Sequence, residues 1–228
     1  MIKKLDWDSI FFGYPIGQCI LSSASDNFDE ELFLKNTSEF LLTYIFSAYP
    51  LHSNLFALVD EKLVFEKKIN KNISLVEPPV FFNPKIHIPS DLLRLVFLSG
   101  KYSRFNRDKK FENYEFEKLY TEWINKSLFT NTNSQIIVKF IDGKLAGFLS
   151  FSIDDITTKI ELIAVDEDFQ GKGIGSTLIG QIVIIACNHL CEKIEVVTQG
   201  LNSAAIHLYE KNNFTCINKT YIYHYWKR

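Results

Sequence analysis

The sequence has little of the features that mark several classes of protein. Its four cysteines include no CxxC pair, so no disulfide framework is indicated. An excess of one charge is also missing: the formal net charge is −2 at pH 7 and no basic block occurs, which argues against nucleic acid as a partner. No apolar run reaches the length of a membrane span, and the first residues lack the apolar core of a signal peptide. These absences predict a cytoplasmic protein with neither a nucleic-acid nor a membrane partner.

The cysteines leave one role to consider, which is metal binding. Cys187 and Cys191 lie one helical turn apart, a spacing that two metal ligands can have. No further cluster of cysteine or histidine completes a site, however, and free thiols in a reducing cytosol are the better explanation of the pair. We therefore expect no bound metal.

The sequence does contain the material of a globular core, with 46% hydrophobic and 23% charged residues. Its 228 residues suit one large domain or two small ones. Pro78-Pro79, Pro84 and Pro89 interrupt the chain between two regions of regular pattern. This predicts a smaller α/β N-terminal region over residues 1–88 and a larger domain over residues 89–228.

The periodicity of apolar residues predicts the elements of both regions. The N-terminal region is expected to contain a turn at 12–15, a helix over 29–48, and strands over 55–68 and 73–77. The larger domain is expected to contain helices over 90–99, 113–128, 173–190 and 202–212, and strands over 136–141, 145–153, 159–165, 193–198, 214–218 and 220–226. Asp142-Gly143 is a strong two-residue hairpin signal, and the strand–helix–strand unit over 159–198 requires a right-handed crossover between parallel strands. The fold class is therefore α/β, with a mixed sheet flanked by helices.

Three glycines at alternate positions, Gly171, Gly173 and Gly175, lie between the strand that ends at Val165 and the next helix. Without Cβ atoms, this backbone can close tightly on a ligand and point successive N–H groups at it. The start of the helix adds its unsatisfied amides and the positive end of its dipole. The loop thus predicts a site for a pyrophosphate, unless it is a glycine-rich turn with no ligand.

The spacing of the glycines excludes two common phosphate loops. A Walker A loop needs Ser or Thr after Gly-Lys, but Gly173 follows Lys172. The dinucleotide fingerprint needs a sixth-position glycine, where this sequence has Ser176 or Leu178. The pattern Gln/Arg-x-x-Gly-x-Gly/Ala is met by Gln170, Gly173 and Gly175. This loop resembles the coenzyme A loop of the GNAT superfamily of N-acetyltransferases, which implies acetyl-CoA as cosubstrate and a role for Ile174 and Ser176 beside it.

A second motif runs from Asn202 to Phe214 and is similar to the superfamily's Asn-x-x-Ala-x-x-Leu-Tyr-Glu-Lys-x-Gly-Phe segment. Asn213 replaces the usual glycine, and asparagine also tolerates the left-handed conformation of a helix end. Asn202 is a natural N-cap. A phenol with a pKa near 10 can protonate a departing thiolate. The resemblance implies this role of general acid for Tyr209, whereas a core tyrosine is the alternative.

The same resemblance implies how the rest of the cofactor lies. The parallel strands would splay after Val165, and pantetheine would enter the gap and bond to the backbone of the strand. This gap is the open crevice that α/β sheets form at the carboxyl ends of their strands. The CoA-binding residues implied in addition to the loop are Ile163, Ala164, Val165, Asn202 and Ala205.

The N-terminal half resembles one branch of the superfamily. The segments 5–15, 58–65, 103–108 and 116–124 are similar to parts of the dTDP-4-amino-4,6-dideoxygalactose (TDP-fucosamine) N-acetyltransferases. The resemblance implies a dTDP-linked amino-deoxy sugar as the acceptor, in surface polysaccharide biosynthesis. Asp60 matches a glutamate proposed there to take the amine proton through water, and an exposed carboxylate at a strand end is the alternative. Proteins of this resemblance are often homodimers.

The residues for the acceptor nucleotide come from the segment around 101–107. Lys101, Arg104 and Arg107 would neutralise its pyrophosphate, and Arg104 is able to make paired hydrogen bonds. Tyr102 or Phe105 would stack on the thymine, although basic residues between helices are often only solvated. Two other functions stay open at this point: a GNAT enzyme acting on another amine, such as a protein N-terminus, a polyamine or an antibiotic, and a CoA-binding module without catalysis.

Overall fold

The computed structural model describes residues 2–22, 28–69, 77–129 and 134–227. The chain divides into two compact units. The first contains residues 1–63, 199–201 and 218–228, and the second contains residues 64–198 and 202–217. This division differs from the expected boundary at residue 88, because the last strand, β10 (Thr215–Trp226), pairs with a strand of the N-terminal region.

The first unit is built on strands in the order β1-β2-β3-β10-β4. β2 (Ile16–Leu21) and β3 (Leu42–Ser47) are parallel, and β3 and β10 are antiparallel. The other elements of this region are β1 (Lys3–Lys4), α1 (Asp6–Phe12), α2 (Glu30–Asn36) and the first residues of β4 (Ala57–Lys68). The sheet thus joins residues from both ends of the chain.

The helix expected over 29–48 is wrong in its second half, since α2 ends at Asn36 and residues 42–47 form β3. A short apolar run is compatible with a buried helix or a buried strand. Thr43 and Ile45 are β-branched and fully buried, and such side chains favour the strand. The neighbours β2 and β10, which lie far away in the sequence, decide the outcome.

Three other expectations for this region need correction. The turn-rich opening holds a helix, α1, which ends at Gly13 in the left-handed conformation. The strand β2 was not predicted. The strands expected over 214–218 and 220–226 are one continuous strand, β10. The strand expected over 73–77 lies, apart from Glu77, outside the described residues.

The second unit is a mixed sheet in the order β4-β9-β8-β7-β6-β5, and most of its pairs are antiparallel. Its strands besides β4 are β5 (Val80–Phe81), β6 (Ser134–Ile141), β7 (Lys144–Asp154), β8 (Thr157–Val165) and β9 (Lys193–Gln199). Its helices are α3 (Pro89–Ser99), α4 (Arg104–Arg107), α5 (Glu115–Phe129), the 3-10 helix η1 (Glu167–Phe169), α6 (Ile174–Asn188) and α7 (Ser203–Lys211). These elements confirm the predicted α/β class and the helices and strands predicted between residues 90 and 212. The structure adds β5, α4 and η1 to them.

The hairpin predicted at Asp142-Gly143 is confirmed. Both residues have positive φ angles, 49° and 76°, which is the backbone of the tight turns that match the twist of a two-stranded ribbon. The turn joins β6 to β7. The pairs β6–β7 and β7–β8 have the longest antiparallel registers described in this sheet.

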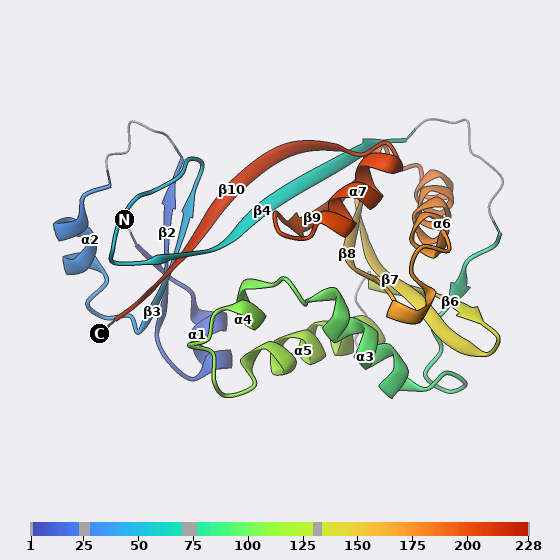
Figure 1. Cartoon of the computed structure of the whole chain (residues 1–228), viewed down its shortest axis with the longest axis horizontal. Helices are drawn as coiled ribbons and strands as arrows, with labels where there is room; N and C mark the ends of the chain where they lie inside the picture. The colour runs from blue at the N-terminus through green and yellow to red at the C-terminus, as the bar shows by residue number, and fades with distance from the viewer. Residues whose placement is uncertain (1, 23–27, 70–76, 130–133, 228) are drawn as a thin grey trace. The chain divides into compact units, whose positions relative to one another are not determined.

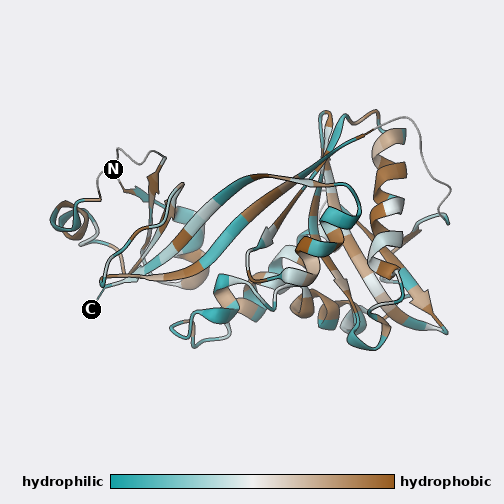
Figure 2. Ribbon diagram, turned by 45° about the horizontal axis from the view of Figure 1, so that its top comes forward, coloured by the Kyte–Doolittle hydropathy of each residue, from teal (hydrophilic) through white to brown (hydrophobic). Residues whose placement is uncertain are grey.

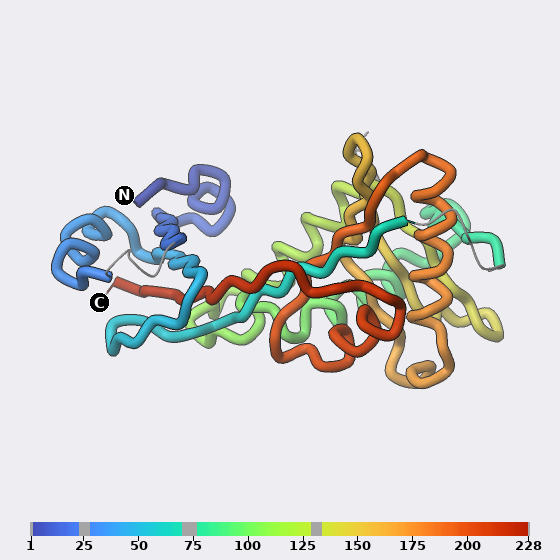
Figure 3. The backbone as a smooth tube through the Cα atoms, turned by 90° about the horizontal axis from the view of Figure 1, so that it is seen from above, coloured from blue at the N-terminus to red at the C-terminus, as the bar shows by residue number. Residues whose placement is uncertain are grey.

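Helices cover both faces of the β6–β8 sheet. α3 and α5 lie on one side and α6 on the other (Figures 1 and 3). Most of α6 is hydrophobic (Figure 2), and Leu178, Ile179 and Ile182 are buried. The start of α6 is thereby held against β7, where the missing side chain of Gly147 leaves room for Ile174 and Leu178.

The parallel strands β8 and β9 separate partway along their length. Their pairing runs from Thr157 opposite Lys193 to Ile160 opposite Val196. After the bulge at residue 161, the last four residues of β8, 162–165, pair with β7 alone in the described chain. The sheet therefore splays as expected, but the gap opens after Ile160 rather than after Val165. The backbone of Ile163 and Val165 borders this gap.

Candidate active site

A groove of about 430 Å³ lies within the second unit, at the carboxyl end of β8. Its walls come from the end of α3 and the residues after it, the end of β8, the loop before α6, and one face of α7. Most of the residues predicted to bind CoA line this groove: Ile163, Ala164, Val165, Gln170, Gly171, Gly173, Ile174, Gly175, Ser176, Asn202 and Ala205. The fold therefore brings together residues that are up to 42 positions apart in the sequence.

The loop before α6 presents a row of unpaired backbone donors. Gly171 and Gly173 have φ angles of 75° and 81°, a conformation that glycine adopts without steric cost. Among the described residues, no protein acceptor takes a hydrogen bond from the N–H groups of residues 171–176. The next amide, that of Thr177, donates to the carbonyl of Gly173 at 3.0 Å. Such a row at a helix start attracts an anion, and it fits a pyrophosphate.

Two side chains of the loop hold its shape. Gln170 donates from Nε2 to the carbonyl oxygen of Val165 at 3.1 Å and so ties the loop to the end of β8. Lys172 donates from Nζ to the carbonyl oxygen of Asp168 at 3.0 Å, and its ammonium lies 4.9 Å from the centre of the Phe169 ring. Lys172 does not line the groove. Its side chain thus contacts the loop itself, and the predicted contact of Lys172 with CoA stays a prediction.

The helix α7 forms the opposite wall. Asn202 caps it, because Oδ1 accepts a hydrogen bond from the amide of Ala205 at 3.1 Å, as its sequence position predicted. At the other end, Asn213 has a φ of 62°, so asparagine takes the left-handed position where the motif usually has glycine. Sequence analysis missed the groove-lining residues Ala204, His207, Leu208 and Lys211. Their spacing of three and four residues marks one helix face, and this periodicity was the available signal.

The third glycine of the loop has a packing role. A Cβ atom on Gly175 would lie 3.1 Å from both methyl carbons of Leu208. This distance is shorter than an ordinary van der Waals contact, so a side chain at residue 175 would force Leu208 to shift, and the glycine favours the close approach of α6 and α7. The two walls of the groove are thus set by a contact that the sequence pattern does not reveal.

Tyr209 is nearly fully buried, with an exposed fraction of 2%. Its ring packs against Phe65 and Phe214 at centroid distances of 5.6 and 5.7 Å. Burial raises the pKa of Tyr209 above its usual value, because the phenolate would lose its hydration. Tyr209 therefore lies in the core as the alternative interpretation held, and it keeps its proton at neutral pH as a general acid must.

The residues proposed for the acceptor nucleotide fall into two groups. Lys101 and Tyr102 line the groove, and the Lys101 ammonium lies 3.9 Å from the carboxylate of Glu167. Arg104, Phe105 and Arg107 belong to α4 and do not line it. Phe105 is buried against Phe111 and Trp123, and the Arg104 guanidinium covers its ring at 4.4 Å. The ring of Phe105 is therefore a core element rather than a surface for stacking on thymine.

Asp60 lies in the first unit, within β4. It is buried, with an exposed fraction of 8%, so the alternative interpretation as an exposed carboxylate at a strand end is wrong. A buried carboxylate needs charged or hydrogen-bonding neighbours to stay ionised. Its role as a base stays a prediction.

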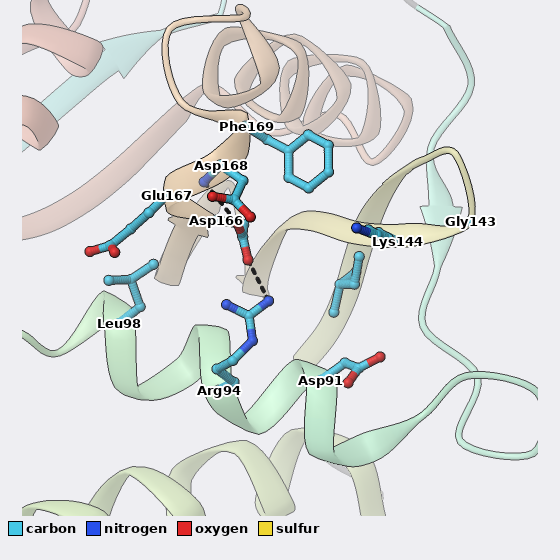
Figure 4. Close-up of a pocket in the computed structure, with 10 residues that line it drawn as sticks. Asp91, Arg94, Leu98, Gly143, Lys144, Asp166, Glu167, Asp168 and Phe169 are labelled. Carbon is cyan, nitrogen blue, oxygen red and sulfur yellow. Dashed lines mark hydrogen bonds and ion pairs between the residues drawn. The ribbon is translucent and has the colours of Figure 1, made fainter.

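A second hollow, of about 660 Å³, lies on the other side of η1 (Figure 4). Arg94 of α3 forms an ion pair with Asp166, whose side chain also accepts a hydrogen bond from the amide of Asp168 at 2.9 Å. Burial opposes the charge on Asp166, but the bond from Asp168 and the ion pair with Arg94 together hold the pKa of this carboxyl below its usual range. These contacts join α3 to the residue that follows β8, next to the groove.

Replacing Arg94 with methionine is expected to make the fold more sensitive to acid. A carboxyl group with a lowered folded pKa stabilises the protein above its unfolded pKa, near 3.9, and this stabilisation is lost as the pH falls through the folded pKa. Without Arg94, the pKa of Asp166 rises and acid unfolding starts at a higher pH. At pH 7 the melting temperature should fall by about 2–4 °C, the shift that about 1 kcal/mol produces in a chain of this size. Circular dichroism across pH 2–7 measures both effects, with Arg94→Lys, which keeps the charge, as the control. An unchanged acid midpoint in Arg94→Met would contradict the role of the ion pair.

In the described ranges, no three side chains of His, Cys, Asp or Glu come together as a metal site would require. The four cysteines are free thiols. None of the helices that the structure describes is long and apolar enough to cross a membrane.

Residues 101–214, half of the chain, match the acetyltransferase (GNAT) family. The matched range contains the loop before α6, the end of β8 and all of α7. Among curated proteins, the chain is similar to the spore coat polysaccharide biosynthesis protein SpsD of Bacillus subtilis (strain 168), with 27% identity over 124 residues, which is 54% of this chain and 43% of SpsD. The chain spans less than half the length of SpsD and of a second curated relative, the uncharacterized protein YdhI of the same organism.

Solved structures extend the likeness in fold beyond the matched family range. A conserved protein of unknown function from Staphylococcus epidermidis ATCC 12228 has a TM-score of 0.63 at 11% identity, over 94% of this chain and 85% of that one. An acetyltransferase of the GNAT family from Colwellia psychrerythraea has a TM-score of 0.54 at 12% identity, over 86% of this chain and 71% of that one. At such identities the likeness concerns the fold alone.

Proposed function

The chain belongs to the acetyltransferase (GNAT) family, and from this premise we propose that it acetylates the amino group of a dTDP-linked amino-deoxy sugar in the cytoplasm, in surface polysaccharide biosynthesis. The family membership makes the chain an N-acetyltransferase that uses acetyl-CoA. The acceptor and the role of each residue are not given by the family membership, and we propose them here.

The unpaired N–H groups of residues 171–176 carry the assignment of the donor site. A pyrophosphate has two negative groups, and each hydrogen bond from an amide to a charged oxygen contributes about 1.5–3 kcal/mol. The same groove continues to Ile163 and Val165, where β8 has no β9 partner in the described chain. Backbone groups at a splayed strand are free to bond to the amides of a pantetheine chain. Together the loop and the strand would hold the two ends of the cofactor.

Two observations support the amino-sugar acceptor. The first is the likeness of the segments 5–15 and 116–124 to enzymes that act on TDP-fucosamine. The second is the similarity to SpsD, whose name places that protein in polysaccharide biosynthesis. Lys101 and Tyr102 line the groove near its α3 wall, and we assign them to the nucleotide. A cation and an aromatic ring suit a pyrophosphate and a base.

Acetyl-CoA supplies the thioester whose acetyl group is transferred. In the proposed reaction the sugar amine attacks this carbonyl directly, the C–N bond forms, and the C–S bond breaks. Tyr209 gives its proton to the leaving sulfur and regains one from water before the next turnover. A buried phenol is a weak acid, so this step requires that the thiolate leave in surroundings equally shielded from water, where it is a stronger base. Direct attack needs no covalent acyl-enzyme.

The attacking amine must lose a proton, and we assign this proton to Asp60 through ordered water. Asp60 need not be a strong base, because a partly neutral amine reacts once it is held in position.

An acceptor screen tests the proposal. The protein is incubated with acetyl-CoA and either dTDP-amino sugars, peptide amines, polyamines or aminoglycosides, and free thiol is measured. Thiol release is expected with a dTDP-amino sugar, and the acetylated product should appear by mass spectrometry. Release with a peptide amine or polyamine but with no amino sugar would overturn the acceptor. CoA binding without release across all amines would favour a non-catalytic module.

A further inference from the structure

A hydrogen-bond chain connects the end of α7 to the start of α6. Asn212, the residue that follows α7, donates from its side-chain amide to Ser176 Oγ at 3.1 Å and to the carbonyl oxygen of Leu208 at 2.7 Å. The backbone carbonyl of Asn212 accepts a hydrogen bond from the Lys67 ammonium at 2.8 Å. Ser176 lies in the first turn of α6 and lines the groove.

The contact with Leu208 fixes the orientation of the Asn212 amide. A carbonyl oxygen only accepts hydrogen bonds, so the amide atom facing Leu208 is the NH₂ group rather than the oxygen. The same NH₂ group faces Ser176. The amide therefore donates to Ser176 Oγ, and the serine oxygen is the acceptor in this contact.

This direction determines where the proton of Ser176 can point. A serine hydroxyl has one proton and two acceptor positions, and Asn212 uses an acceptor position. The neighbouring Thr177 donates its own hydroxyl proton to the carbonyl of Gly173 at 3.3 Å, as hydroxyls in helices often do. No such bond from the Ser176 hydroxyl to another described residue is present. Its proton is available to a ligand in the groove.

We propose that Asn212 is a positioning residue that orients the Ser176 hydroxyl as a hydrogen-bond donor to the CoA pyrophosphate. The hydroxyl adds a side-chain donor to the row of amides that ends at the same residue. The bond from Asn212 also draws electron density from the hydroxyl oxygen, which makes its proton a better donor. This inference rests on the use of acetyl-CoA and is independent of the acceptor.

The contact with Lys67 keeps Asn212 in place without touching the hydroxyl. The Lys67 ammonium lies at the carbonyl end of α7, where a positive charge is favourable, and 5.9 Å from the centre of the Phe214 ring. Lys67 therefore offers a matched control, because its loss weakens the end of the helix and leaves the direction of the Asn212 amide unchanged.

A double-mutant cycle tests the proposal by calorimetric titration with CoA. Ser176→Ala should weaken CoA binding about tenfold, because it removes a hydrogen bond to a charged group. Asn212→Ala should weaken it about threefold to tenfold. In the Ser176→Ala background, Asn212→Ala should have no further effect, because the hydroxyl that it orients is absent. Asn212→Asp should weaken binding at least as much as Asn212→Ala, since a carboxylate would take the hydroxyl proton for itself.

Each variant is also melted, to separate binding from folding. Lys67→Met should lower the melting temperature and leave CoA affinity within about twofold of the parent. Ser176→Thr, which keeps a hydroxyl, should retain most of the affinity. The proposal would be overturned if Asn212→Ala lowered CoA affinity equally with and without the Ser176 hydroxyl. It would also be overturned if Asn212→Ala did not lower CoA affinity at all. If the parent protein binds CoA and acetylates no amino sugar, the proposed acceptor fails while this inference stands.

Discussion

Replacing Tyr209 with phenylalanine is expected to lower turnover by about a hundredfold or more, with CoA affinity unchanged within about twofold. The substitution removes the hydroxyl and keeps the ring between Phe65 and Phe214, so packing changes little. Without the phenol, the sulfur must leave as a thiolate or take its proton from water. Steady-state turnover with an active acceptor, together with CoA titration, measures the two quantities separately.

The pH profile gives a second readout for Tyr209. An ordinary tyrosine begins to lose its proton as the pH approaches 10, and burial raises the pKa of Tyr209 above that value. The acid therefore stays protonated between pH 7 and 9.5, and turnover of the parent protein should not fall through loss of this proton. A decline in that range which disappears in Tyr209→Phe would contradict the raised pKa.

Tyr120 provides the matched control. It is buried to a similar degree, with an exposed fraction of 4%, and packs against Phe116 and Trp123 in α5. Tyr120→Phe removes a buried hydroxyl away from the groove, so turnover should stay within about twofold. Equal turnover in Tyr209→Phe and the parent would exclude Tyr209 as the acid.

Replacing Gly173 with alanine is expected to weaken CoA binding about tenfold to a hundredfold, as measured by calorimetry. Gly173 has a φ of 81°, and no atom lies within 4 Å of the position that a Cβ would take. The new methyl group would therefore clash with nothing in the protein, and it would stand beside the row of amides where the pyrophosphate is expected. Loss of one or two hydrogen bonds to a charged group accounts for this range.

Gly143→Ala is the control that separates the effect of such a substitution on CoA binding from its effect on stability. Gly143 has a φ of 76° and also no atom within 4 Å of a Cβ, but it lies in the hairpin between β6 and β7. Alanine at either position should cost about 1 kcal/mol of stability, because a left-handed backbone disfavours a side chain. Only Gly173→Ala should weaken CoA binding. A similar loss in Gly143→Ala would mean that backbone strain, and not the cradle, controls affinity.

Local features of the site could be predicted from the sequence because they depend on a few consecutive residues. The glycine loop before a helix, the cap at Asn202 and the hairpin at Asp142-Gly143 follow from backbone geometry that neighbours in the sequence impose. The left-handed Asn213 belongs to the same class. Each of these predictions needed only residue type and spacing.

Contacts between residues that are distant in the sequence could not be predicted from residue type and spacing. Phe105 fits a stacking residue by type, yet it is buried in the helical layer. The Asn212 amide reaches Ser176 because α6 and α7 pack closely where residue 175 has no side chain.

The sequence by itself determined the family of the chain, the anion cradle at the start of α6 and the cap of α7, because these arise from conformations within one or two turns of the chain. The tertiary structure alone decided that residues 42–47 form a strand, that β10 pairs with β3, and where β8 and β9 separate. Burial of apolar surface against distant neighbours outweighs local preference in those segments. The loop presents the free backbone amides on which the proposed cofactor site depends, and packing decides which side chains line the groove beside them.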